Sequence, residues 1–443
     1  MEFSFDPLRY RYPSRRRVVY GRKGMVCTSQ PLAALAGLDM IKKGGNAVDA
    51  AVAAAAAMTV LEPTSNGLGG DAFALVWLKG QSKPYGLNAS GPAAALADPQ
   101  KLRQAGHKEV PKHGWPAVNV PGAVGGWQAL WQRFGRLPFA GLLEPAATYA
   151  EEGYAVSPVI SRLWEKAFGS FSKLSGPEFA GWGPVFAPKG HAPQAGEVWR
   201  SPDHAASLRQ IAETGGEAFY RGRLAEEMDS FSQKTGGWLR KEDLAAYKAE
   251  WVEPITTNYR GYDVWEIPPN GHGIVALMAL NILEGFSFTE RNAEAYHKQL
   301  EAIKLAFADG QRYVTDPRYM KVRPEELLSK EYAARRRRLI GREAITPRFG
   351  DPASGGTIYL CTADGEGNMV SFIQSNYQGF GSGVVVPGTG IALHNRGVNF
   401  SLDPAGENCL APGKKPYHTI IPGFLSKAGQ AVGPFGVMGG FMQ

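Results

Sequence analysis

Residues 355–363 read Gly-Gly-Thr-Ile-Tyr-Leu-Cys-Thr-Ala, a Gly-Gly-Thr step that opens a run typical of a β-strand. A threonine hydroxyl is a weak nucleophile, but a threonine at a chain N-terminus carries its own general base, an α-amino group with a pKa of about 8. Cutting the bond between Gly356 and Thr357 would create that arrangement, and glycine lets the backbone bring the hydroxyl close to the preceding carbonyl. The same residues are also an ordinary strand start, so the motif by itself favours a structural role over catalysis.

The pattern of the chain differs on the two sides of this stretch. Helical periodicity dominates residues 102–344, whereas strand-like runs and turns follow residue 357. The clearest expected helices lie at 50–61, 142–152, 205–214 and 293–313, and the clearest strands at 73–78, 358–363 and 369–373. We therefore expect helices sandwiched with strands that come from both ends of the chain. The loosest segment of the second half is 346–356.

Length, composition and charge restrict the classes of protein to which this chain can belong. The chain has 443 residues, of which 44% are hydrophobic and 20% charged, which is the composition of a globular protein. This length fits one large α/β unit or two packed layers. The net charge is +7, but basic residues are dispersed except at 15–17 and 335–338, and no nucleic-acid motif accompanies them. We expect no nucleic-acid partner.

Cysteine and histidine usage points away from metals and disulfide frameworks. Cys27, Cys361 and Cys409 show no Cys-x-x-Cys spacing, and the eight histidines show neither His-x-x-x-His nor His-Glu-x-x-His. We expect no metal and no other cofactor. A reducing compartment fits, the N-terminus has no apolar signal region, and the run 50–61 is too short to cross a bilayer. The expected location is the cytoplasm, with no membrane partner.

Other catalytic motifs are weak or absent. There is no Gly-x-Ser-x-Gly elbow, and the glycine-rich loop 67–70 lacks the Lys-Ser/Thr of a phosphate-binding loop. Gly439-Gly440, after an apolar run, could present two backbone N–H groups to a developing oxyanion, although a plain turn explains these glycines as well.

Several further stretches surround Thr357 at wide spacing: Gly-Gly-Asn-Ala-Val-Asp-Ala-Ala at 44–51, residues 62–71, Val120-Pro121-Gly122, residues 297–316, and Gly439-Gly440. Together they resemble the γ-glutamyltranspeptidase family over nearly the whole chain. The resemblance implies an α/β protein, a four-layer αββα sandwich of the N-terminal-nucleophile hydrolase type with antiparallel central sheets. It also implies one precursor that cuts itself into a large subunit, 1–356, and a small subunit, 357–443. Whether these assemble into a homo-oligomer stays open.

The resemblance assigns the catalytic roles. It makes Thr357 both the processing residue, cut after Gly356, and the catalytic nucleophile. Ser375 stands where the family has a threonine that hydrogen-bonds the nucleophile, and Gly439 and Gly440 form the oxyanion hole.

The implied donor-binding positions depart from the family pattern. Asn88 replaces the arginine that holds the α-carboxylate of a γ-glutamyl donor, Asn399 an aspartate, Tyr377 an asparagine, Arg396 a glutamine, and His418 with Thr419 a serine pair. A zwitterionic glutamyl group would be poorly paired in such a site. Arg396 is expected either to hold an acid group in another pose or to pair with a nearby acid such as Asp403. Segment 401–414 is short where many members carry a lid, which favours an open site.

The sequence thus predicts an autoprocessing N-terminal threonine amidohydrolase or acyltransferase that cleaves a small γ-glutamyl or related acyl amide, with a role in glutathione metabolism. One alternative is an acylase, similar to the cephalosporin-acylase-like or oxamate-amidohydrolase-like members, with little activity on glutathione. The other is a truncated or unprocessed scaffold that only binds ligand. That alternative arises because relatives continue past the equivalent of Gln443, so that strands of a second sheet are expected to be missing.

Overall fold

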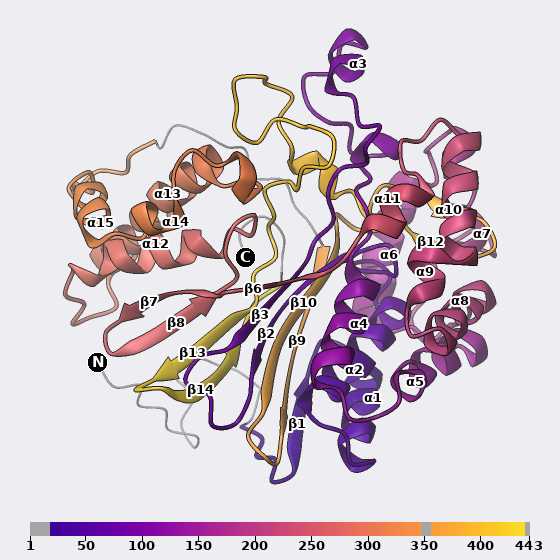
Figure 1. Cartoon of the computed structure of the whole chain (residues 1–443), viewed down its shortest axis with the longest axis horizontal. Coiled ribbons are helices and arrows are strands. Elements are labelled where there is room, and N and C mark those ends of the chain that lie inside the picture. The colour runs from indigo at the N-terminus through magenta and orange to yellow at the C-terminus, as the bar shows by residue number, and fades with distance from the viewer. Residues whose placement is uncertain (1–17, 347–355, 439–443) are drawn as a thin grey trace.

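A six-stranded antiparallel sheet forms the centre of the protein (Figure 1). The computed structural model describes residues 18–346 and 356–438. The strand order is β1 (Gly24–Cys27), β9 (Gly356–Asp364), β10 (Met369–Tyr377), β2 (Asp71–Trp77), β3 (Tyr85–Ala89) and β6 (Glu250–Val252). The two central strands on either side of β10 therefore come from opposite ends of the chain, and all neighbours pair antiparallel.

A second, four-stranded antiparallel sheet packs against the first. Its order is β14 (Gln430–Phe435), β13 (Gly423–Lys427), β8 (Tyr262–Glu266) and β7 (Ile255–Tyr259). Large apolar side chains from both sheets interdigitate between them, and the rings of Trp77 and Phe424 stack with their centroids 5.2 Å apart. Because side chains alternate across a strand, every second residue of β2 and β9 faces this inter-sheet core.

Helices cover the outer face of the six-stranded sheet. The alanine-rich α2 (Ala47–Leu61) is buried along its whole length and packs on β9 and β10. It begins with a capping box between Asn46 and Asp49, which satisfies its first backbone N–H groups. Small side chains all round let its neighbours approach closely, namely α1 (Pro31–Lys42), α4 (Ala123–Phe134) and α5 (Phe139–Glu152), the last of which also packs on α8 (Pro202–Glu213).

A second helical layer covers the four-stranded sheet. It consists of α12 (Gly273–Glu284), which contacts β7 and β8, with α13 (Ala293–Tyr313), α14 (Pro324–Leu327) and α15 (Lys330–Arg337). The layer order is helix, sheet, sheet, helix, which confirms the expected four-layer α/β sandwich (Figure 1). Among the described helices, none is long and apolar enough to cross a membrane.

Most elements expected from the sequence are present. The helices α2, α5, α8 and α13 and the strands β2, β9 and β10 lie where the patterns predicted them, within a few residues at their ends. The exception is the segment of β6 to β8, which lies inside the stretch expected to be helical. β6 is an edge strand of the first sheet, and β7 and β8 form half of the second. These strands have three to five residues each, too few for a clear alternation.

The hairpin between β7 and β8 closes with a tight turn. Tyr259 pairs with Tyr262, so that only Arg260 and Gly261 form the loop, and both have positive φ, 54° and 86°. That is the backbone of a two-residue type I′ turn, which matches the twist of the strands it joins.

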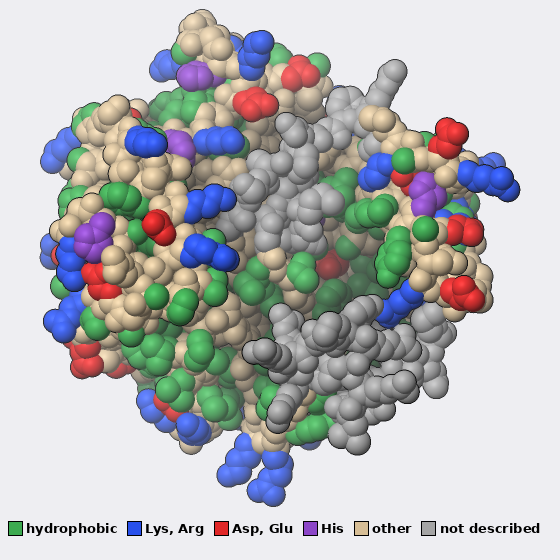
Figure 2. Space-filling model, turned by 180° about the vertical axis from the view of Figure 1, so that it is seen from behind, with side chains coloured by type: hydrophobic (Ala, Val, Ile, Leu, Met, Phe, Trp, Pro, Cys, Tyr) green, Lys and Arg blue, Asp and Glu red, His purple; other side chains and the backbone are tan. Residues whose placement is uncertain are grey.

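Seen from behind, the molecule is hollowed near its middle (Figure 2). Hydrophobic side chains line much of the hollow, and on this face Lys and Arg lie among Asp and Glu. This distribution agrees with the dispersed charge of the sequence.

Candidate active site

Thr357 lies at the beginning of β9, on the face that meets the second sheet. Its side chain is buried, and its Oγ1 atom is 3.1 Å from Oγ of Ser375 on the adjacent strand β10. Ser375 in turn accepts a hydrogen bond of 2.7 Å from the backbone N–H of Tyr377. The structure therefore brings together the predicted nucleophile and its predicted hydroxyl partner.

An irregularity of the ladder produces this arrangement. The pairing of β9 with β10 shifts between Gln374 and Tyr377, and Tyr377 has a φ of 74°. A β-bulge redirects side chains and ends regular pairing, and positive φ at a bulky residue stores strain that the surrounding packing must hold. Strain of this kind is concentrated at functional sites, which supports a site at this end of the sheet.

Asp71, the first residue of β2, stands directly opposite Ser375 in the ladder. Its carboxylate is fully buried and accepts two hydrogen bonds from Arg396, from Nε at 2.8 Å and from Nη2 at 3.0 Å. It also accepts from Nε2 of His418 at 2.7 Å, while Nη1 of Arg396 donates to Oγ1 of Thr419 at 2.8 Å. Two predicted site residues, Arg396 and His418, therefore converge on one carboxylate, and Arg396 connects it to a third, Thr419.

Glycine makes this convergence possible. Gly69, in the loop before β2, lies so close to the chain near residue 392 that a Cβ atom there would be 2.3 Å from the carbonyl oxygen of Ala392. The N–H of His394 also donates to the Gly69 carbonyl at 3.0 Å. The glycine-rich loop thus serves close backbone packing, which holds Asp71 against the segment that carries Arg396.

The electrostatics of this cluster follow from its burial. Burial alone would raise the pKa of Asp71, but Arg396 and His418 reverse this and hold that pKa well below its usual range. Burial and the neighbouring Arg396 lower the pKa of His418 to about 4, and burial lowers that of His394 to about 4. At neutral pH the cluster therefore pairs one carboxylate with one guanidinium, and the histidines are uncharged.

Tyr377 and Asp403 were also expected near Arg396. The guanidinium lies over the Tyr377 ring, 4.6 Å from its centroid, which is a cation–π geometry. Asp403 is exposed and is not the partner of Arg396, since Asp71 takes that place. The expectation of an acid partner was right in kind, but the acid comes from a different part of the chain.

The remaining predicted donor-site residues have local partners. The side chain of Asn88 donates to Oδ1 of Asn270 at 2.9 Å and accepts from the N–H and hydroxyl of Ser90. Asn399 ends a short 3₁₀ turn, and its backbone carbonyl accepts from Asn408. The predicted oxyanion glycines, Gly439 and Gly440, lie outside the described residues. Gly356 pairs with Tyr377 at the start of β9.

Asp71 and His394 are the residues of the cluster that sequence reasoning did not select. Asp71 ends a stretch used for the family resemblance, but nothing in the sequence linked it to Arg396, 325 positions away. His394 was missed for the same reason: it is distant from Asp71 in the sequence, and only the fold brings its Nδ1 to 3.9 Å from the Asp71 carboxylate.

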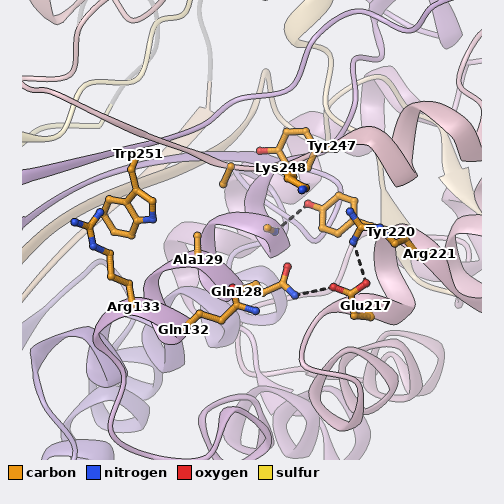
Figure 3. A pocket seen from close by; sticks show the side chains of 12 residues that line it. Gln128, Ala129, Gln132, Arg133, Glu217, Tyr220, Arg221, Tyr247, Lys248 and Trp251 are labelled. Carbon is orange, nitrogen blue, oxygen red and sulfur yellow. Dashed lines mark hydrogen bonds and ion pairs between the residues drawn. The ribbon is translucent and has the colours of Figure 1, made fainter.

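A cavity of about 460 Å³ lies elsewhere, between α4, α9 (Glu217–Arg221) and residues 247–251 (Figure 3). It opens on the helical side of the six-stranded sheet, because α4 packs on the outer face of β2 and β3, whereas Thr357 faces the second sheet.

In the described residues no group of three or more His, Cys, Asp or Glu side chains could hold a metal ion.

Comparison with known proteins agrees with this geometry. The family model described as γ-glutamyltranspeptidase matches residues 33–443. The chain is 39% identical to the glutathione hydrolase-like YwrD proenzyme of Bacillus subtilis, over 95% of this chain and 80% of that protein. It is 36% identical to the oxamate amidohydrolase proenzyme of Klebsiella pneumoniae, over 94% and 79%.

Solved structures place the fold in the same group. The crystal structure of cephalosporin acylase from Bacillus halodurans aligns with a TM-score of 0.94 and 59% identity, covering 99% of this chain and 82% of that one. The γ-glutamyltranspeptidase of Helicobacter pylori aligns with a TM-score of 0.70 and 30% identity, covering 74% and 95%. With its sandwich and its threonine at the start of β9, the chain belongs to the γ-glutamyltranspeptidase family of amide-cleaving enzymes.

Proposed function

We propose that the protein cuts its own chain before Thr357 and then hydrolyses a small acyl amide with that threonine as the nucleophile. The observation that carries this proposal is the buried contact of 3.1 Å between the hydroxyls of Thr357 and Ser375. It lies where β9 begins and β10 ends. Its relatives in B. subtilis and K. pneumoniae are both named proenzymes, which supports processing of this chain.

In the self-cleavage step, the Thr357 oxygen attacks the carbonyl carbon of Gly356. The C–N bond then breaks and the acyl group moves to the oxygen as an ester. The proton that the hydroxyl loses ends on the nitrogen, which becomes a free α-amine. Water hydrolyses the ester, which leaves a carboxylate on Gly356 and a free Thr357 N-terminus. The Ser375 hydroxyl can donate to or accept from the Thr357 hydroxyl across their contact of 3.1 Å, and it also accepts from the Tyr377 N–H.

In the catalytic step, the new α-amine takes the proton of the Thr357 hydroxyl while the oxygen attacks the substrate carbonyl. The amine of the substrate leaves with a proton, and water resolves the acyl-enzyme. We propose that the backbone N–H groups of Gly439 and Gly440 stabilise the oxyanion. An amine in place of water would give acyl transfer, which is the transferase form of the same proposal.

The charge of the site favours an acyl group other than γ-glutamyl. A γ-glutamyl donor brings an α-carboxylate and an α-ammonium, whereas the cluster at Thr357 pairs its one described guanidinium with Asp71. Asn88 offers no positive charge and is held by Asn270 and Ser90. A carboxylate buried there without a bidentate cation would lose the strongest kind of hydrogen bond available to it. The names of the acylase and amidohydrolase relatives point the same way.

Hydrolysis of γ-glutamyl compounds is the second candidate. The family is named for γ-glutamyl transfer, and the B. subtilis relative is named glutathione hydrolase-like. Arg396 makes three N–H contacts with Asp71 and Thr419, out of five N–H groups that a guanidinium has. An N–H left over could still reach an acid group of the donor, as the sequence predicted for Arg396.

A matched series of anilides separates the two candidates. Glutaryl and γ-glutamyl p-nitroanilide differ only by the α-amino group, and the butyryl compound also lacks the carboxylate. We expect kcat/KM for the glutaryl or butyryl compound to exceed that for the γ-glutamyl compound at least tenfold, about 1.4 kcal/mol. A γ-glutamyl compound that is the best of the three, together with micromolar KM for glutathione, would replace the proposal with the second candidate.

A further inference from the structure

Two of the three cysteines face each other across the junction of the proposed subunits. In the antiparallel pair of β1 and β9, Cys27 stands directly opposite Cys361. Cys27 is exposed, whereas Cys361 is half-buried against the core between the two sheets. Directly opposite residues of an antiparallel pair project from the same face of a sheet, so that the two thiols lie side by side.

The strand geometry suits a disulfide at this position. Opposite residues of antiparallel strands have Cα atoms about 4.5 to 5.5 Å apart, which lies within the range of about 4.4 to 6.8 Å found for disulfides. Their Cβ atoms must approach by about 0.7 to 1.7 Å to reach the mean disulfide separation of about 3.8 Å. Cys27 can make that adjustment, because it is the last residue of β1 and β1 is the edge strand of the sheet.

The two thiols also differ in reactivity. A hydrogen bond from the Cys361 thiol lowers the pKa of Cys27, whereas the same contact, followed by burial, raises the pKa of Cys361. Cys27 is therefore the better thiolate and is exposed to solution, and Cys361 keeps its proton behind it. An exposed low-pKa thiol next to a second thiol is the arrangement of attacking and resolving cysteines.

We propose that Cys27 and Cys361 form a reversible disulfide that joins the large and small subunits covalently. The statement about subunits rests on the proposed cleavage before Thr357, since Cys27 lies before that bond and Cys361 after it. The oxidant is a small-molecule disulfide. The Cys27 thiolate attacks one of its sulfurs and releases one thiolate; Cys361 then loses its proton, attacks the Cys27 sulfur and releases the second. Two cysteines are oxidised, and one small disulfide is reduced to two thiols.

Such a bond would tie the nucleophile strand to the sheet edge. Cys361 lies on β9, the strand that begins at the nucleophile Thr357. Side chains two positions apart on a strand point to the same face, so Thr357, Tyr359 and Cys361 share one face of β9. After cleavage, β9 begins at a free end, and the disulfide would keep the small subunit attached even when the hydrogen bonds of the ladder are lost.

A non-reducing gel tests the proposal, with Cys409 as a matched control. Cys409 is half-buried outside this strand pair, and its thiol lies 3.7 Å from the carbonyl of Leu410. The protein is treated with glutathione disulfide or with dithiothreitol, its remaining thiols are blocked with N-ethylmaleimide, and it is then denatured. Scaling the mass of 47.8 kDa by 356/443 gives fragments of roughly 38 and 9 kDa.

We expect the oxidised wild type and Cys409→Ser to run as one band at the full mass and to separate into two after reduction. Cys27→Ser and Cys361→Ser should give two bands under both conditions. A wild type that separates into two bands after oxidation, or a full-mass band in Cys27→Ser that reduction separates, would overturn the proposal. So would a stable mixed disulfide on Cys27 that Cys361 does not resolve.

Thiol counting keeps this test independent of the proposed cleavage. In Thr357→Ala, a single chain, maleimide uptake measured by intact mass should fall from three thiols before oxidation to one afterwards. Three reactive thiols after oxidation would contradict the disulfide, whereas an uncut wild type with one reactive thiol would contradict only the cleavage.

Discussion

Asp71 and Arg396 form the ion pair on which the electrostatics of the site depend. Both side chains are almost completely buried, and each takes part in further hydrogen bonds, to His418 and Thr419. A buried pair of this kind contributes little net stability, but breaking it leaves one charge in a medium that cannot solvate it. The pair therefore fixes the site in one arrangement and makes each residue depend on the other.

We predict that Arg396→Gln and Asp71→Asn each lower the free energy of unfolding by about 3 to 5 kcal/mol, because each leaves an uncompensated buried charge. The double variant removes both charges and should be more stable than the sum of the two losses implies. Urea denaturation of the four proteins measures this. Strictly additive losses would show that the two side chains do not interact.

The sequence also predicted that Arg396 holds an acid group of the donor, and one of its remaining N–H groups would have to do so. In Arg396→Gln, binding of the glutaryl donor should weaken by about 1.5 to 3 kcal/mol relative to the butyryl donor, the range for hydrogen bonds to charged groups. Steady-state KM values for both anilides provide the measurement. An equal loss for both donors would mean that Arg396 only supports the structure.

The sequence could identify single residues of the site but not their partners. Thr357 and Ser375 lie on adjacent strands joined by a short turn, so their meeting follows from local pattern and family resemblance. The partner of Arg396 could not be found in this way, because Asp71 meets it only where the loop that holds Gly69 packs against residues 392–394. Sequence proximity instead suggested Asp403, which faces solvent.

At the scale of elements, long and strongly patterned segments were predictable and short ones were not. The alanines of α2 and the apolar runs of β2, β9 and β10 each carry enough residues to set a period. The strands β6 to β8 have only three to five residues. β6 is a strand because it pairs with β3 in the first sheet, and β7 and β8 are strands because they pair within the second sheet, which α12 covers. Tertiary packing therefore decided what local pattern left open.

Close packing of α1 on α2 gives a prediction for two helical glycines. A Cβ at Gly37 in α1 would lie 2.8 Å from the Ala50 carbonyl oxygen, whereas one at Gly169 in α6 (Pro158–Phe171) would meet nothing within 4 Å. Gly37→Ala should therefore destabilise the protein by about 1 to 3 kcal/mol through overpacking. Gly169→Ala should stabilise it by up to about 1 kcal/mol through helix propensity. Equal effects of the two changes in thermal denaturation would refute this account of the α1–α2 contact.

At the scale of the whole molecule, buried neutral histidines couple folding to pH. Burial lowers the pKa of His204, His394 and His418 to about 4 and that of His272 to about 3. The unfolded chain binds these protons at a pKa near 6.5, so that between about pH 6.5 and pH 4 it carries more protons than the folded protein. Stability from these groups is therefore present above about pH 6.5 and is lost as the pH falls.

We predict that the free energy of unfolding decreases on acidification through this window, by about 1.4 kcal/mol per pH unit for each proton that only the unfolded chain binds. Thr357→Ala suits the measurement, because the proposed cleavage requires the Thr357 hydroxyl and this variant is expected to unfold as one chain. His204→Gln, in that background, should reduce the slope by about one proton, since His204 is held by Thr59 away from the Asp71 cluster. If the dependence of the free energy of unfolding on pH is the same in this variant, His204 does not contribute to it.

Identification of the N-terminus of the small fragment tests the central claim most directly. Freshly purified wild type, Thr357→Ser and Thr357→Ala are incubated and analysed by intact mass and N-terminal sequencing. We predict that the wild type yields a fragment beginning at Thr357, that Thr357→Ser is cut at the same bond because a hydroxyl nucleophile remains, and that Thr357→Ala stays one chain. A wild type that remains whole, a fragment that begins at another residue, or cleavage of Thr357→Ala at this bond would contradict the account.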